Sequence, residues 1–188
     1  TLDVTPVNDA PVVDAITDQV IDEDGSLTLE LSGTDVDGDD LTFSASASNA
    51  TATVEGTVLT VTPAADYNGT IIVSVTANDG ALDGIGSFIL EVTPVNDAPV
   101  VATISDQVID EDSSLTLELS ASDIDGDAVT FGVYVDNGSA TVDGTALTVT
   151  PAADYNGDIT VTVSASDGTL SGTDTFILTV TPVNDIPV

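Results

Sequence analysis

The chain carries one short acidic string twice. Asp35-Val36-Asp37-Gly38-Asp39-Asp40 recurs as Asp123-Ile124-Asp125-Gly126-Asp127. A spacing of two places alternate carboxylates on one side of an extended backbone. Calcium takes about six to eight oxygen ligands and prefers carboxylates, amide oxygens and backbone carbonyls, whereas magnesium dehydrates reluctantly. The string therefore indicates calcium chemistry.

The composition restricts the other ions and reactions. The sequence contains no His and no Cys, so zinc and copper lack their favoured nitrogen and sulfur ligands. Paired carboxylates can hydrolyse glycosides. Here each acidic pair is duplicated, and no His, Cys, Lys or Arg is present to act as base, nucleophile or oxyanion partner. We therefore expect a non-enzymatic protein.

An EF-hand is the other motif that begins with such a string. That loop requires a glutamate at about its twelfth position and a helix on each side. Counted from Asp35, that position is Ser46, and the flanking residues alternate as in strands. An EF-hand is therefore set aside.

The net charge limits the partners. The chain has 33 acidic residues and no Lys, Arg or His, for a formal charge of -33. Nucleic acid and anionic membrane surfaces are excluded, because both require cationic side chains. Such self-repulsion destabilises a compact state unless salt screens it or bound cations neutralise part of it. Acid-rich solubility in a salty habitat is the alternative reading, but the acids cluster in turns.

An internal repeat organises the whole chain. Val7-Asn8-Asp9-Ala10-Pro11-Val12 returns 88 residues later from Val95, and a near copy begins at Val183. A fixed period of this kind indicates an array of similar domains. We predict the last strand and linker of a preceding repeat over 1–10, one repeat with its linker over 11–97, a second over 98–181, and a further linker over 182–188.

The strand pattern predicts an all-β fold. Leu27, Leu29 and Leu31 alternate with polar residues, and turns rich in Gly, Asp, Asn and Pro separate similar runs. About seven strands are expected per repeat, in the first near residues 12–21, 27–31, 41–43, 52–54, 59–61, 71–77 and 88–92. This density predicts two tandem immunoglobulin-like β-sandwiches, end to end, with Phe43, Phe88 and Phe131 in the cores.

The acidic residues together resemble the calcium motifs of cadherin repeats, in the bacterial cadherin-like form found in large secreted adhesins and polysaccharide-degrading proteins. The resemblance covers both repeats. Glu23 and Glu111 resemble the cadherin glutamate before the second strand. The remaining matches, in chain order, are Asp35 and Asp37 with Asp123 and Asp125, Asp66 and Asn68 with Asp154 and Asn156, Asp79 with Asp167, and the linker pair Asn96 and Asp97.

The resemblance implies calcium at each repeat junction. The central junction would use Glu23, Asp66, Asn68, Asn96, Asp97, Asp123, Asp125 and Asp167. The upper half of the preceding junction would be Asn8, Asp9, Asp35, Asp37 and Asp79, and the lower half of the next one Glu111, Asp154, Asn156, Asn184 and Asp185. The sequence departs from the family at Pro94, where the first linker aspartate is expected, and at Asn68, where a glutamate is expected.

These observations predict a calcium-rigidified spacer of a large bacterial adhesin or surface fibre, secreted or at the cell surface. Its partners would be neighbouring repeats of the same chain. The alternative is a calcium-dependent module that binds polysaccharide or another copy of itself. Carbohydrate platforms usually expose aromatic rings, and of the three tyrosines Tyr67 and Tyr155 recur in one turn and are expected to be structural. Tyr134 is unpaired and is the candidate for exposure.

Overall fold

The computed structural model describes Asp3, Thr5 and residues 7–184. The chain divides into two compact units, Thr1–Val95 and Asn96–Val188. The described residues form strands, turns and loops and contain no helix. Among the described residues there is accordingly no helix long and apolar enough to cross a membrane. The expected strand over the first five residues falls mostly outside the described part, and Asp3 and Thr5 lie in no strand.

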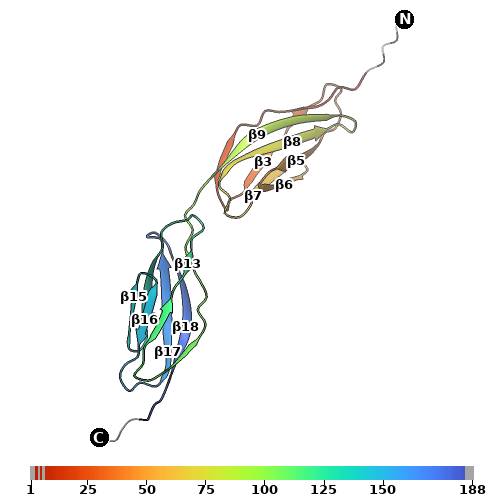
Figure 1. The fold of residues 1–188 in the computed structure, drawn as a ribbon. Helices are drawn as coiled ribbons and strands as arrows, with labels where there is room; N and C mark the ends of the chain where they lie inside the picture. The colour runs from red at the N-terminus through yellow and green to blue at the C-terminus, as the bar shows by residue number, and fades with distance from the viewer. Residues whose placement is uncertain (1–2, 4, 6, 185–188) are drawn as a thin grey trace. The chain divides into compact units, whose positions relative to one another are not determined.

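The first unit is built from nine short strand segments. They are β1 (Val12–Val13), β2 (Gln19–Asp22), β3 (Leu27–Glu30), β4 (Gly33–Thr34), β5 (Thr42–Ala47), β6 (Ala50–Glu55), β7 (Val58–Pro63), β8 (Gly69–Asn78) and β9 (Asp83–Thr93). One sheet has the order β2-β9-β8-β5 and the other β3-β7-β6, with β1 and β4 paired separately. Strand β2 runs parallel to β9, and all other pairs are antiparallel. Figure 1 shows the long β8 and β9 side by side.

The sequence predicted the sandwich correctly, but it predicted one continuous strand where the structure has two, and it missed β4. The segment expected around 12–21 is divided, because β1 pairs with β4 whereas β2 pairs with β9 in the four-stranded sheet. The strand expected over 27–31 is confirmed as β3, and the short β4 that follows it was not predicted. Alternation marks which face a residue occupies, but it does not reveal that a chain changes partner partway along.

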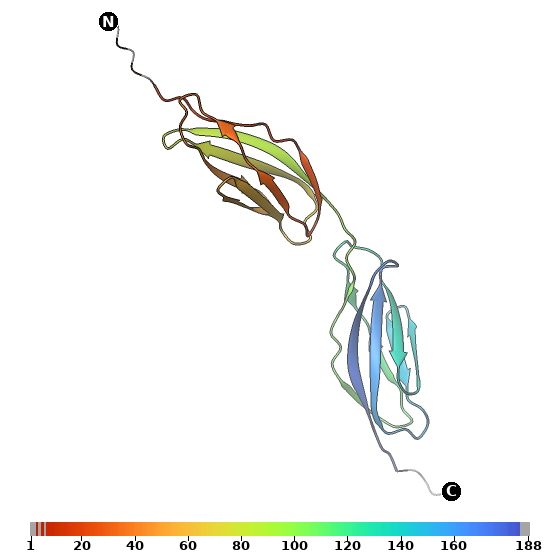
Figure 2. The ribbon, with the colours of Figure 1, turned by 180° about the vertical axis from the view of Figure 1, so that it is seen from behind.

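The second unit repeats this arrangement. Its strands are β10 (Val100–Val101), β11 (Gln107–Asp110), β12 (Leu115–Glu118), β13 (Ala121–Ser122), β14 (Thr130–Val135), β15 (Ser139–Asp143), β16 (Ala146–Thr150), β17 (Gly157–Ser166) and β18 (Ser171–Thr181). The sheets have the orders β11-β18-β17-β14 and β12-β16-β15, with β10 and β13 paired. Seen from behind in Figure 2, β17 and β18 again form the long hairpin.

Each unit has its own hydrophobic core between its sheets. In the first, Leu59, Ile71 and Leu90 are fully buried; in the second, Leu147 and Phe176 occupy the corresponding interior. Burying such a side chain contributes about 1.5–3 kcal/mol. The aromatic residues predicted for the core are confirmed there: Phe88 is buried, and Phe43 and Phe131 pack against the buried clusters. The inward positions of the strands are thereby occupied by apolar residues, which leaves the acidic residues to the loops and outer faces.

Candidate metal centre

The acidic loop between β4 and β5 closes around a single carboxylate. Asp35 Oδ1 accepts hydrogen bonds from the backbone N–H groups of Asp37 at 2.8 Å, Gly38 at 3.1 Å and Asp39 at 3.4 Å. An aspartate that accepts from the residues following it stabilises a turn. Gly38 has a φ of 84°, which a residue without a Cβ adopts readily. The turn thus holds Oδ1 of Asp35 through backbone hydrogen bonds and leaves Oδ2 without a bond from the loop backbone.

Two further contacts tie the segment before β1 to this loop. Asn8 Nδ2 donates to Asp79 Oδ2 at 2.9 Å, and the backbone N–H of Asp9 donates to Asp37 Oδ2 at 2.8 Å. Asn8 and Asp37 also line a surface hollow together with Asp39. The five residues predicted for the upper half of a junction are therefore brought together at one end of the first unit.

The second unit builds the same cluster from its own residues. Asn96 Nδ2 donates to Asp167 Oδ2 at 2.8 Å, and the backbone N–H of Asp97 donates to Asp125 Oδ2 at 2.8 Å. Asp123 Oδ1 accepts from the backbone N–H groups of Asp125 at 3.0 Å and Asp127 at 3.2 Å. These four hydrogen bonds occur in both units, although the backbone N–H of Gly126 donates to the Asp123 backbone carbonyl where that of Gly38 donates to Asp35 Oδ1. The repeated residues therefore encode most of the arrangement.

The remaining oxygen of the central aspartate has no protein partner. Among the side-chain nitrogen and oxygen atoms in the described part of the chain, only Asp35 Oδ2 and Asp123 Oδ2 are buried without a hydrogen-bond partner. A buried, unpaired carboxylate oxygen is costly. The sequence contains no Lys, Arg or His that could pair with it. A cation from solution fits this oxygen, and a hard cation with oxygen ligands fits the whole cluster.

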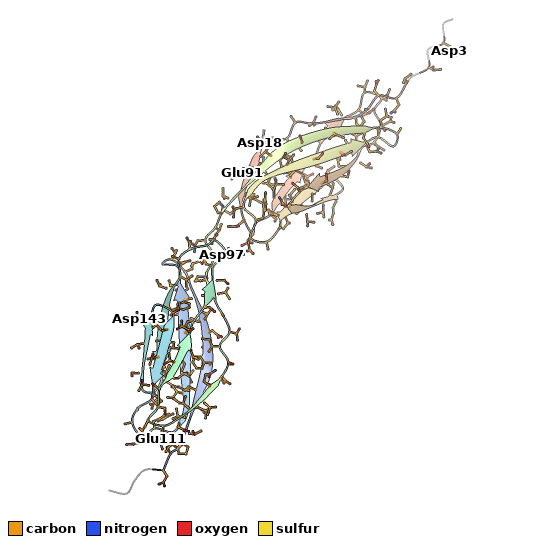
Figure 3. The ribbon with its side chains drawn as sticks, viewed as in Figure 1. Asp3, Asp18, Glu91, Asp97, Glu111 and Asp143 are labelled. Carbon is orange, nitrogen blue, oxygen red and sulfur yellow. The ribbon has the colours of Figure 1, made fainter. Side chains whose placement is uncertain are left out.

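A buried glutamate occupies the other end of each unit. Glu23 is 4 % exposed, and its Oε1 accepts a hydrogen bond from the backbone N–H of Val95 at 2.5 Å. Glu111 is 8 % exposed and accepts from the backbone N–H of Val183 at 2.6 Å. Figure 3 places Asp97 and Glu111 at opposite ends of the second unit. Each unit therefore has an acidic cluster at one end and a buried glutamate at the other.

Each buried glutamate and the other ligands predicted for the same end of the domain form what we call the lower set. These other ligands lie in the turn before the long hairpin. Asp66 and Asn68 lie between β7 and β8, and Asp154 and Asn156 lie between β16 and β17. A carboxylate oxygen of Asp66 lies within 4.8 Å of one of Asp24. Asn184 is described and exposed. Asp185 lies outside the described residues.

Comparison with known proteins identifies the repeat. Residues 8–85 and 96–181 each match the family described as bacterial Ig domain. The chain belongs to that family. Bacterial Ig domains are typically extracellular or cell-surface modules, and the fold is typically non-enzymatic. The predicted family and fold, two tandem Ig-like sandwiches of the cadherin-like type, are confirmed.

Similar proteins include two enzymes and a protocadherin. Chitinase A of Pseudoalteromonas piscicida is 32% identical over 165 residues, which are 82% of this chain but only 20% of the chitinase. Human protocadherin-24 EC1-2 is similar in structure, with a TM-score of 0.55, 20% identity and coverage of 94% of this chain and 100% of the other. An endo-fucoidan hydrolase of glycoside hydrolase family 107 gives a TM-score of 0.44 at 21% identity, over 93% of this chain and 29% of the hydrolase. The chain thus spans about a fifth of the curated relative and under a third of the hydrolase.

Hydrogen bonding lowers the pKa of one carboxyl group in each Ig domain. The backbone N–H of Leu82, followed by the side chain of Asn8, holds the pKa of Asp79 below its ordinary value of 3.8. For Asp167 the side chain of Asn96 is the largest cause of the lowered pKa, followed by the backbone N–H of Thr169. Donors that stabilise the carboxylate keep it charged, so both groups remain available as anionic ligands in mildly acidic solution.

Sequence reasoning missed Asp24 and its repeat Asp112. Asp24 directly follows the buried Glu23. Asp24 and Asp112 have positive φ values of 61° and 60°. Asp66 and Asp154 share this left-handed backbone, with φ of 56° and 57°. The adjacent Glu-Asp pair was visible in the sequence, but the resemblance assigned only the glutamate. The turn conformation that carries Asp24 near Asp66 was not visible.

Proposed function

We propose that the two bacterial Ig domains are a calcium-rigidified spacer segment of a large extracellular bacterial protein, such as an adhesin or surface fibre. Calcium would bind the acidic cluster at the start of each domain and the glutamate-containing set at its end. This role requires no catalytic residue and no distinctive surface, which agrees with the similarity of the two repeats along their whole length. The partners are the neighbouring domains of the same chain.

The observation that carries the proposal is the unpartnered Oδ2 of Asp35, copied at Asp123. In each loop the Oδ1 atom is occupied by backbone donors, while the carboxylates of Asp37 and Asp79 accept hydrogen bonds from the preceding segment. The atoms that remain available to bind a metal are carboxylate oxygens. Calcium accepts such oxygens in a flexible geometry.

Chain connectivity gives binding its mechanical consequence. Val95, whose N–H is held by Glu23, is joined by a peptide bond to Asn96, whose side chain is held by Asp167. Cations that neutralise the clusters flanking this bond reduce carboxylate repulsion, and we propose that they draw ligands from both domains and restrict bending. Extracellular calcium modules often bind with a Kd of about 10⁻⁴–10⁻³ M. Calcium at a hundred times Kd would stabilise one site by about 2.7 kcal/mol.

The test is a calcium titration by calorimetry, paired with thermal unfolding in calcium and in chelator. We expect the double variant Asp35→Asn and Asp123→Asn to lose most of the calcium-dependent rise in Tm. The double variant Glu55→Gln and Asp143→Asn is the matched control, because it removes one charge per domain from exposed residues at the ends of β6 and β15. Equal calcium responses in the wild type and in the double variant at Asp35 and Asp123 would count against the proposal.

Polysaccharide binding is the second candidate. Tyr134 is 68% exposed on β14 and projects from the sheet that also contains Thr162 and Thr175. An exposed aromatic ring presents an apolar face on which a neutral sugar can stack. The similarity to a chitinase makes chitin the natural first probe. Sedimentation with insoluble chitin should retain the wild type and lose Tyr134→Ser; retention of neither protein leaves the spacer role.

A further inference from the structure

Three Asn-Gly pairs occur in the chain, at Asn68-Gly69, Asn137-Gly138 and Asn156-Gly157. An asparagine followed by glycine is chemically labile, because no Cβ on the next residue shields its backbone nitrogen. The three pairs therefore share one intrinsic reactivity in the unfolded chain. Their surroundings in the folded domains differ, so the structure can separate them.

Asn137 is held in place. Its Oδ1 accepts a hydrogen bond from the backbone N–H of Ala152 at 3.3 Å, and its side chain is half-buried. Gly138 packs so closely that a Cβ there would collide with the Thr150 carbonyl oxygen and with Pro151. Movement of the Gly138 nitrogen toward the Asn137 side chain would disturb this packing.

Asn68 and Asn156 are differently placed. Both side chains are exposed, and in the described part of the chain no side-chain hydrogen bond holds either of them. Gly69 and Gly157 are the first residues of β8 and β17, where strand ends open most easily. The nearest atom to a Cβ on Gly69 would be the Tyr67 hydroxyl, at 3.5 Å, and the nearest to one on Gly157 the Tyr155 hydroxyl, at 3.1 Å. Both are side-chain ends, so the backbone at these two pairs is less tightly enclosed than at Gly138, where a Cβ would collide with backbone atoms.

We propose that Asn68 and Asn156 are sites of spontaneous deamidation in the folded protein, and that Asn137 is protected. The backbone nitrogen of Gly69 attacks Asn68 Cγ, so that an N–C bond forms and the Cγ–Nδ2 bond breaks. The nitrogen's proton leaves with the amide as ammonia, and a cyclic imide remains. Water then opens the imide to aspartate or isoaspartate, and the net reaction consumes one water and releases one ammonia. Gly157 and Asn156 react in the same way.

The position gives the modification a consequence that rests on the proposed calcium function. Asn68 lies two residues after Asp66, whose carboxylate is within 4.8 Å of that of Asp24. Conversion replaces a neutral amide in this turn with a carboxylate. The lower set of each domain would therefore gain one charge with age and bind calcium more tightly, since more carboxylates raise the affinity of an oxygen site.

The first arm of the test measures the chemistry alone. The intact two-domain chain is incubated at mildly alkaline pH, folded or in denaturant, and then cleaved at glutamate, because a chain without Lys or Arg gives trypsin no site. Fragmentation mass spectrometry follows each asparagine. We expect all three to convert at similar rates in denaturant, and Asn137 to become several-fold slower than Asn68 and Asn156 on folding. Equal protection of all three, or faster conversion of Asn137, would overturn the inference.

The second arm measures the consequence. Asn68→Asp and Asn156→Asp imitate the aspartate product, and the glutamine variants at the same positions are controls that retain a slowly reacting amide. We expect the aspartate pair to bind calcium several-fold more tightly than the glutamine pair. Equal calcium affinity in the two pairs contradicts the consequence alone. Absence of calcium binding in every variant, with conversion still selective, contradicts the proposed function and leaves the deamidation sites standing.

Discussion

Asn8 and Asp79 lie 71 residues apart in the sequence, yet Asn8 Nδ2 donates a hydrogen bond to Asp79 Oδ2 at 2.9 Å. The copy of this pair, Asn96 and Asp167, has a distance of 2.8 Å. The bond joins the segment that enters a domain to the turn between its two longest strands. Since the same pairing occurs in both domains, the entering segment is held by a defined contact before any ion binds.

Removal of the Asn96 amide should change the acidity of its partner. In Asn96→Ala the largest cause of the lowered pKa of Asp167 is lost, so that pKa should rise toward its ordinary value. Carboxyl carbon shifts followed by NMR through an acid titration in chelator measure this directly. Asn8→Ala in the same experiment should move Asp79 and leave Asp167 unchanged; an unmoved Asp167 in Asn96→Ala contradicts the assignment.

The lowered pKa values predict a defined acid dependence of stability without calcium. Because Asp167 has a lower pKa folded than unfolded, the unfolded state binds the extra proton first as the pH falls. The contribution of Asp167 to the free energy of unfolding is therefore fully present above pH 3.8, its ordinary pKa, and is lost as the pH falls through the lowered pKa of the folded state. We expect the difference in unfolding free energy between wild type and Asp167→Asn to shrink over that window. Comparison with the variant cancels the general effect of neutralising the other carboxylates.

The effect of replacing the buried Glu23 on the Tm should change sign when calcium is added. In chelator, Glu23→Gln removes a buried charge while keeping an oxygen that can accept from Val95, so its Tm should equal or exceed that of the wild type. In excess calcium the wild type should gain more, and the variant should melt below it. Thermal unfolding monitored by circular dichroism, with and without calcium, measures both differences. A variant that melts below the wild type by the same amount in both buffers would make Glu23 purely structural.

Close contact between β9 and Pro11, the residue before β1, should make Gly84 irreplaceable. A Cβ at Gly84 would collide with the Pro11 carbonyl oxygen, and the same holds for Gly172 and Pro99. Gly84→Ala should destabilise the first domain by about 1–3 kcal/mol, the usual cost of overpacking. Denaturant unfolding in chelator gives the value, with Ser87→Ala on an outward position of β9 as control. A loss under about 0.5 kcal/mol, typical of surface substitutions, would contradict the contact.

The sequence predicted the sandwich from local signals that are repeated, whereas the residues of the acidic cluster at the start of each domain came from the resemblance to cadherin repeats. Alternation placed Leu59 and Leu90 inside, and the spacing of Asp35 and Asp37 indicated a turn rich in carboxylates. The division of the first strand between two sheets was missed, since β1 and β2 differ in their partners and not in their pattern.

The decisive feature of the site was equally hidden from the sequence. One oxygen of Asp35 is capped by backbone donors, and the other is buried without a partner. The fold of the loop decides which oxygen accepts the backbone hydrogen bonds and which is buried without a partner. The types of the residues alone do not predict this. The role of Asp24 was missed for the same reason, because its proximity to Asp66 follows from two left-handed turns.

The most direct measurement of the calcium account is a crystal structure of the two-domain chain grown with calcium in excess. The account predicts calcium bonded at about 2.3–2.6 Å, the usual calcium–oxygen distance, to Oδ2 of Asp35 and of Asp123. Anomalous scattering would identify the ion. Water or empty density at both oxygens, under saturating calcium, would contradict it.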